Sequence, residues 1–424
     1  MGPAPTSRHR GALVAWRLAL VSFTLAAFTG AFMRFGMYLG LPWGLQLGDV
    51  RHAHSHLMFF SWATPALALA AHTALGAVGR RLPGGQAAAV AAAAAGLAAY
   101  VPFLLSGYRL MPVGEAELPL SMMVSGLNGL VWYALAGLYL AGSWRAPRTP
   151  ALRLFDGAFA MLLASTVGVL LLMADGLGGT STPQRVAANA DLFLSLFADG
   201  WFGLGLLGAL AATRFRHAAG GSIGAATWAL AVGLCARSGA RLVTGLGVTD
   251  GLRWLEAAGG LAAAAAWLWL VLALWRGGPT QPRADRPAVT TGQLVAYLSL
   301  GLVALKAVVE VVMALPAGET FVERQGLRVL FLHAYLLGAV TLGLVSFGRA
   351  RLGEGAWRGL GAFAAAVGVM VGLLLPLTGL WPAALAGFWA LPAAAFSSLG
   401  PAFLGAFALA STWGEGRASA TTPR

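Results

Sequence analysis

Apolar segments of about 20 residues recur along almost the whole chain, and each is long enough to cross a bilayer as a helix. The chain is 58% hydrophobic and only 10% charged, with a mean hydropathy of +0.74. Soluble domains carry about 25% charged residues, so this chain has too few polar side chains to cover a water-exposed surface. The sequence therefore predicts an all-α, polytopic membrane protein with the lipid bilayer as its solvent.

We expect about twelve transmembrane helices, joined by short connections rich in glycine and proline. The apolar segments cover residues 12–38, 54–76, 86–106, 119–141, 152–174, 191–212, 224–246, 253–275, 292–315, 328–347, 359–380 and 384–412. No soluble domain fits between them, so residues 1–424 are expected to form a single transmembrane helical bundle domain. Transmembrane strands would instead give alternating segments of about 10 residues, and the sequence lacks that pattern.

The basic residues predict the orientation of this bundle. The net charge is +13, and arginines gather in alternate connections, as in the pairs Arg80–Arg81 and Arg145–Arg148. Acidic residues favour the other connections. This is the positive-inside pattern, which places both termini in the cytoplasm and accounts for the positive charge without a nucleic-acid partner. We expect a location in a bacterial inner membrane.

Five ionisable residues lie inside the expected spans, where an unpaired charge costs several kcal/mol. They are Asp199, Arg237, Arg241, Lys306 and Glu310. Arg237 and Arg241 share a helix face, and Lys306 and Glu310 have the spacing of an i, i+4 pair. Two interpretations fit. The charges could form buried ion pairs that tie helices together, or the three cations could bind an anionic cofactor group such as a haem propionate.

Three histidines, His52, His54 and His56, lie within five residues at the start of the second apolar segment. At about 100° per residue, a helix places His52 and His56 on one face and His54 on nearly the opposite one. The triplet therefore cannot be one three-histidine metal site while it remains helical. His333, near the start of the tenth segment, should reach a similar depth on the same side. One histidine from each of two helices can bind haem iron from both sides.

The stretch HSHLMFFSWATP resembles span two of subunit I of the haem-copper oxidase superfamily. With His54 taken as the family's histidine, Met58, Phe60 and Pro65 fall in register. The resemblance implies that His54 is an axial ligand of a low-spin haem, and that the bundle is cytochrome oxidase subunit I-like. Twelve spans with both ends inside also match the family.

The stretch FLHAYLLG resembles the family's span ten, which supplies the second axial ligand. His333 falls on the low-spin haem ligand, whereas Phe331 occupies the place of the high-spin haem ligand. The segments in the place of spans six and seven contain no histidine, although the family's copper ligands come from these spans. The resemblance thus implies a degenerate member that lacks the copper site and is not a functional terminal oxidase.

A second resemblance concerns the NnrS family, which consists of twelve-span haem proteins tied to nitric oxide stress. The stretch HAYLLGAVTLGLVSFGRARLG is similar to a signature of that family. The matching positions are His333, Ala334, Gly338, Arg349, Leu352 and Gly353. This resemblance implies a role in gas sensing or nitric oxide response.

Three functions follow as hypotheses. The leading one is an integral membrane haem protein that holds a haem b between His54 and His333 and serves in electron transfer, gas sensing or nitric oxide response, with a redox partner protein. The second is an ion- or metal-coupled membrane transporter that uses the buried charges as a relay. The third is a haem or copper assembly factor in which His52 and His56 bind copper as an i, i+4 pair.

Overall fold

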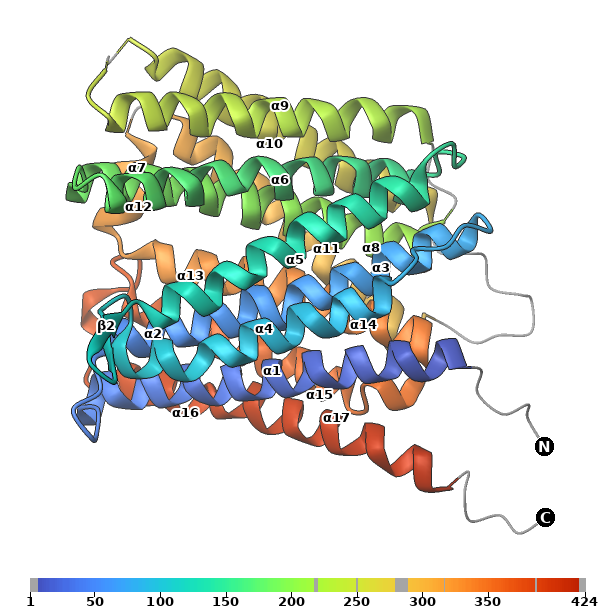
Figure 1. Cartoon of the computed structure of the whole chain (residues 1–424), viewed down its shortest axis with the longest axis horizontal. Coiled ribbons are helices and arrows are strands. Elements are labelled where there is room, and N and C mark those ends of the chain that lie inside the picture. Colours follow the sequence, from blue (N-terminus) through green and yellow to red (C-terminus); the bar gives the residue numbers. More distant parts are fainter. Residues whose placement is uncertain are drawn as a thin grey trace.

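In a computed structural model, the chain is a bundle of long helices that run roughly parallel to one another (Figure 1). The structure describes residues 7–216, 220–248, 251–278, 289–315, 317–385 and 387–418. The first residues of α1 and the last residues of α17 lie on the same side of the bundle (Figure 1). The expected all-α, polytopic membrane fold is confirmed.

The helices of the first half of the chain are α1 (Ser7–Leu39), α2 (Leu47–His56), η1 (Leu57–Ala63), α3 (Thr64–Ala77), α4 (Gly85–Ser106), α5 (Leu120–Ser143), α6 (Pro150–Leu177), α7 (Pro183–Leu194), η2 (Ser195–Leu204) and α8 (Gly205–Thr213). A short antiparallel hairpin, β1 (Met111–Val113) and β2 (Ala116–Leu118), joins α4 to α5. Gly114, with a φ of +64°, turns the hairpin. The sequence did not lead us to expect this hairpin.

The second half contains α9 (Gly220–Gly245), α10 (Arg253–Gly277), α11 (Thr291–Ala314), α12 (Gly318–Arg324), α13 (Leu327–His333), η3 (Ala334–Thr341), α14 (Leu342–Leu352), η4 (Glu354–Ala356), α15 (Leu360–Gly372), η5 (Leu375–Leu377), η6 (Ala383–Leu385), α16 (Ala390–Ser397) and α17 (Leu399–Ala418). The side chain of Thr290 caps the start of α11 by accepting a hydrogen bond from the Gln293 amide.

Eleven helical segments within the described residues are long and apolar enough to cross a membrane. Each matches one of the twelve expected spans. The remaining expected span, 224–246, corresponds to α9, which has 26 residues but is not among the eleven. α9 carries two arginines within its apolar sequence, and this lowers its hydropathy. It nevertheless packs beside α10 and α6 within the bundle.

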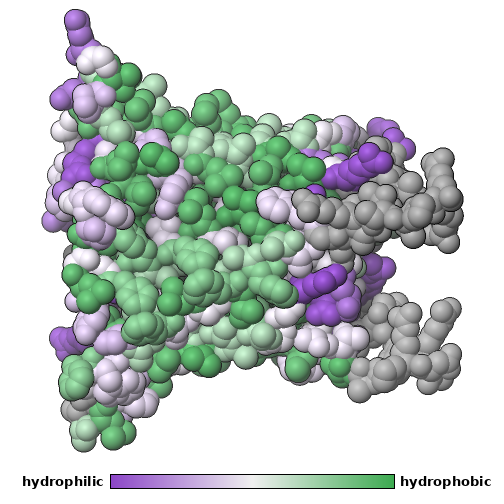
Figure 2. All heavy atoms as spheres, turned by 90° about the horizontal axis from the view of Figure 1, so that it is seen from below, coloured by the Kyte–Doolittle hydropathy of each residue, from purple (hydrophilic) through white to green (hydrophobic). Residues whose placement is uncertain are grey.

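The surface has the distribution of polarity that a bilayer requires. Hydrophobic residues form a broad band across the face seen in Figure 2, and hydrophilic residues gather at both ends of that band. Large apolar side chains such as Trp228 and Val232 remain more than half exposed. In water this exposure would be costly, whereas lipid chains solvate it at no cost. Contact with the lipid bilayer therefore follows from the exposed surface.

Three spans form the centre of the bundle, and each contains a π-helical segment: α2–η1–α3, α7–η2–α8 and α13–η3–α14. A π-helical segment widens a helix locally, and such segments are frequent at functional sites. The threonines that follow η1 and end η3 show the altered ladder. Thr64 Oγ1 donates to the Phe59 carbonyl at 2.9 Å, and Thr341 Oγ1 donates to the Leu336 carbonyl at 3.0 Å, both five residues back.

Side-chain hydrogen bonds link these three spans in a closed cycle. Trp62 Nε1 donates to Thr341 Oγ1 at 3.3 Å, which joins η1 to η3. Trp201 Nε1 donates to Thr64 Oγ1 at 3.3 Å, which joins η2 to α3. The Tyr335 hydroxyl donates to the Ala198 carbonyl at 2.9 Å, which joins η3 to η2. Each of the three π-helical segments therefore contributes one donor to the cycle.

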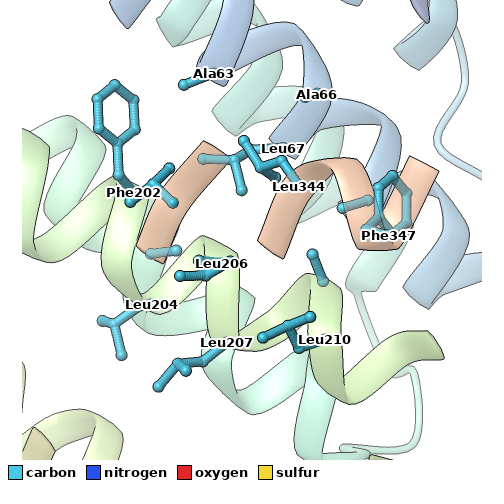
Figure 3. Packing of buried hydrophobic residues seen from close by; sticks show 14 of the residues in the cluster. Ala63, Ala66, Leu67, Phe202, Leu204, Leu206, Leu207, Leu210, Leu344 and Phe347 are labelled. Atoms are coloured by element: carbon cyan, nitrogen blue, oxygen red, sulfur yellow. The ribbon is translucent and has the colours of Figure 1, made fainter. Parts of the chain in front are cut away.

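Apolar packing fills the space beside this cycle. Figure 3 shows leucine and phenylalanine side chains of α3, η2, α8 and α14 meeting in one cluster. Leu67, Leu206 and Leu344 are at most 1% exposed. Because lipid chains are as apolar as leucine, the fit of these side chains, rather than hydrophobicity, holds the spans together.

Candidate functional site

The histidine triplet is divided between two faces of α2, as helix geometry predicts. His54 faces α1, where its Nδ1 lies 2.8 Å from the Ala26 carbonyl oxygen. His56 faces α4, and its ring stacks on Phe103 with the centroids 3.8 Å apart. The two sides of the triplet thus have different surroundings and can serve different purposes.

His52 and His56 lie against aromatic side chains. The His52 ring meets Tyr108 edge-on at 4.6 Å, and the His56 ring meets Phe60 edge-on at 4.9 Å. His56 Nδ1 lies 2.9 Å from the His52 carbonyl oxygen. Among the described residues, no three or more of histidine, cysteine, aspartate and glutamate form a group that could hold a metal ion. Copper binding here would therefore depend on two imidazoles alone.

His54 has room for its ring because α1 offers a glycine at the point of closest approach. A Cβ added to Gly30 would lie 2.9 Å from Cε1 and 3.2 Å from Nδ1 of His54. Gly30 is one turn beyond Ala26, whose carbonyl oxygen lies beside His54 Nδ1. α1 therefore fixes the orientation of this imidazole with one backbone carbonyl and one missing side chain.

His333 lies at the end of α13, next to the start of η3. Its Nδ1 is 2.8 Å from the Val329 carbonyl oxygen, one turn back, and its Nε2 is 3.2 Å from Nη2 of Arg34 on α1. His333 is also close enough to His54 for the two rings to interact electrostatically, and Arg34 acts on both. The fold thus brings together one histidine from the second span and one from the tenth.

The hydrogen bonds of these two histidines determine which ring nitrogens are free. A carbonyl oxygen can only accept a hydrogen bond, so Nδ1 of His54 and Nδ1 of His333 both carry the proton and donate. Each Nε2 then keeps its lone pair. Metal-ligating histidines commonly have this arrangement, in which a backbone carbonyl fixes the tautomer and the other nitrogen binds the metal. Both rings are also partly accessible. The donor set therefore fits a haem iron.

Arg34 is a residue that sequence reasoning did not assign to the site. It lies one turn beyond Gly30 on α1, and only 7% of it is exposed. From the sequence it counts as one of several arginines near span ends. The available signal was its position inside the last turns of an apolar segment, but nothing in the sequence indicated that α1 approaches α13.

Four of the five charges predicted inside the spans form a closed ring of ion pairs. Asp199 Oδ2 lies 3.1 Å from Arg237 Nη2, and Asp199 Oδ1 lies 3.2 Å from Lys306 Nζ. Glu310 Oε1 lies 2.8 Å from Lys306 Nζ, and Glu310 Oε2 pairs with Arg237 Nη1. Each carboxylate therefore bridges both cations. The ring is neutral in total and joins η2, α9 and α11.

This ring is deeply buried. Lys306 is 1% exposed, Glu310 is 4% exposed, and Asp199 and Arg237 are less than 10% exposed. The Lys306 ammonium also lies 5.1 Å from the centroid of the Tyr335 ring and 5.6 Å from that of Trp267, within the range of cation–π attraction. Of the two interpretations of these charges, ion pairs that tie helices together fit the distances. A role of Arg237 and Lys306 towards propionates stays a prediction.

Arg241 belongs to a separate pair. Its Nε lies 2.5 Å from Glu256 Oε1 on α10, and its Nη1 lies 3.8 Å from Asp191 Oδ1 on α7. Although Arg237 and Arg241 share a face of α9, one helical turn between them places them in different clusters. A propionate contact for Arg241 also stays a prediction.

Replacing Gly30 with alanine should weaken metal binding at the histidines without removing a donor. The new Cβ would displace the His54 ring and break its hydrogen bond to the Ala26 carbonyl. We expect the haem content of the purified protein to fall by more than half, as measured by absorption. Gly126→Ala is the matched control, since a Cβ there meets nothing within 4 Å. Unchanged haem content in Gly30→Ala would contradict this reading.

Comparison with known proteins shows the fold alone. No family model and no curated protein sequence matches the chain. Among solved structures, the chain is similar to one described as a "heme-copper terminal oxidase dimer", with a TM-score of 0.67 and 13% sequence identity. The match covers 99% of this chain and 85% of the other. The chain therefore has the fold of a haem-copper terminal oxidase subunit.

Proposed function

We propose that this chain is an integral membrane haem protein in which His54 and His333 bind a haem b as its two axial ligands. The observation that supports this most directly is the hydrogen bonding of the two imidazoles. Each donates from Nδ1 to a backbone carbonyl and keeps Nε2 for a metal, and they come from separate spans beside the buried cation Arg34. The oxidase-like fold is compatible with such a pair.

A bound haem would supply one-electron chemistry, and the protein would set the orientation of the ligands. Two histidines saturate the iron, which favours electron transfer over the binding of a gas. The proposed role is thus electron transfer with a redox partner protein, in a bacterial inner membrane with both termini in the cytoplasm. The NnrS-like stretch after His333 supports nitric oxide response as the setting for this transfer.

Absorption spectroscopy of the purified protein tests the proposal. Wild-type protein, expressed with sufficient haem, is expected to show a Soret band and the sharp reduced bands of a six-coordinate, low-spin haem. His54→Ala and His333→Ala should each remove one ligand and abolish the low-spin spectrum. His52→Ala is the matched control on the opposite face of α2 and should leave the spectrum unchanged.

Two results would disprove the proposal. One is a wild-type protein without a Soret band under haem-replete expression. The other is a low-spin spectrum that survives in both His54→Ala and His333→Ala. Metal analysis of the same preparations tests copper at His52 and His56. A stoichiometric copper content without haem would favour an assembly factor over an electron carrier.

A further inference from the structure

Arg34 is a buried cation whose charge is not compensated by a carboxylate. It is 7% exposed, and no aspartate or glutamate of the described part of the chain forms an ion pair with it. Its contact with His333 Nε2 is a hydrogen bond to a neutral ring. A guanidinium has five N–H donors, so this single acceptor satisfies only a small part of its capacity.

An unpaired charge inside a membrane protein is costly and usually faces a partner or a ligand. The other deeply buried cations of the described chain each have carboxylate partners. Arg237 and Lys306 each contact both Asp199 and Glu310, and Arg241 contacts Glu256. The cation beside the two histidines is therefore the one with free capacity for an anion.

The contact with His333 cannot persist when a metal is bound. Nε2 of His333 has one lone pair, which can either accept the Arg34 hydrogen bond or bind a metal. If His333 becomes a ligand, the Arg34 guanidinium must turn away and find another acceptor. Haem brings such acceptors with it, because its two propionates are carboxylates.

We propose that Arg34 is the residue that recognises a carboxylate of the incoming haem, and that its contact with His333 is its resting position in the cofactor-free protein. This inference rests on the proposed function and adds a specific role to it. Arg34 is a binding residue for the anionic edge of the cofactor, while His54 and His333 bind the iron.

Titration of the haem-free protein with two porphyrins tests this role directly. The probes are ferric protoporphyrin IX and its dimethyl ester, in which both carboxylates are neutral. Wild-type protein should bind the free acid about 10-fold or more tightly than the ester, since a hydrogen bond to a charged group contributes about 1.5–3 kcal/mol. Arg34→Gln should bring this ratio close to one. Arg34→Lys should retain part of it, because the charge remains.

The outcomes separate the two proposals. An acid-to-ester ratio in Arg34→Gln equal to that of the wild type would overturn the carboxylate role. An equal rise in affinity for both porphyrins in Arg34→Gln would also overturn it, because Arg34 would then only block His333. Arg51→Gln is the control for net charge near the site, since Arg51 is exposed. If neither porphyrin gives a histidine-ligated spectrum with wild-type protein, the proposed function itself fails.

Discussion

Replacing Lys306 with methionine is expected to lower the free energy of unfolding by about 3–5 kcal/mol. The substitution removes one of two cations from a buried ring and leaves Asp199 and Glu310 to share Arg237. Removing one partner of a buried pair is costly because the remaining charge is not compensated. Denaturant titration of the protein in detergent micelles, followed by circular dichroism, measures the change.

A charge-balanced double variant is the control. Lys306→Met combined with Glu310→Leu removes one cation and one carboxylate, and the Arg237–Asp199 pair at 3.1 Å remains neutral. This double variant is expected to be more stable than Lys306→Met alone. If the two substitutions destabilise the protein additively, the four groups do not act as one ring, and the structural reading of these charges is wrong.

Replacing Gly203 with alanine is expected to lower the free energy of unfolding by about 1–3 kcal/mol, as overpacking does in a filled core. A Cβ at this position would lie 2.2 Å from Trp267 Cη2 and 2.8 Å from the Tyr335 hydroxyl. Trp267 and Tyr335 are at most 2% exposed and flank the Lys306 ammonium, so neither can move away freely. The same denaturant titration measures the loss.

Gly301 on α11 is the matched control for this substitution, because a Cβ there meets nothing within 4 Å. Gly301→Ala should leave the stability unchanged or raise it slightly, since alanine favours helix more than glycine does. Equal effects of Gly203→Ala and Gly301→Ala would show that the close packing around Gly203 is not the cause of the loss.

The ion ring bears on the alternative of a transporter. A relay needs at least one group that can change partner or charge at low cost. In the ring every carboxylate already bridges two cations, and the attraction holds η2, α9 and α11 together. The geometry supports a structural role, and the stability of the balanced double variant distinguishes the two.

Hydrophobicity alone predicted most of the architecture. The positions of all twelve expected spans coincide with helices, because a chain in lipid must satisfy its backbone hydrogen bonds within each segment. Local spacing also predicted the Lys306–Glu310 pair and the two faces of the histidine triplet, since both depend only on helix periodicity. The three π-helical segments were not foreseen, because their widened turns leave no mark on hydropathy.

Contacts between distant segments explain what the sequence could not supply. Arg34 and His333 are 299 residues apart, and only the approach of α1 to α13 joins them. The same holds for the Arg237–Glu310 pair, 73 residues apart, which the i, i+4 rule could not reveal. The sequence by itself determined that the chain spans the membrane many times and which helix face each histidine occupies. Only the tertiary structure decided which buried cations have carboxylate partners and which one remains beside the histidines, because pairing depends on how helices pack and not on their order.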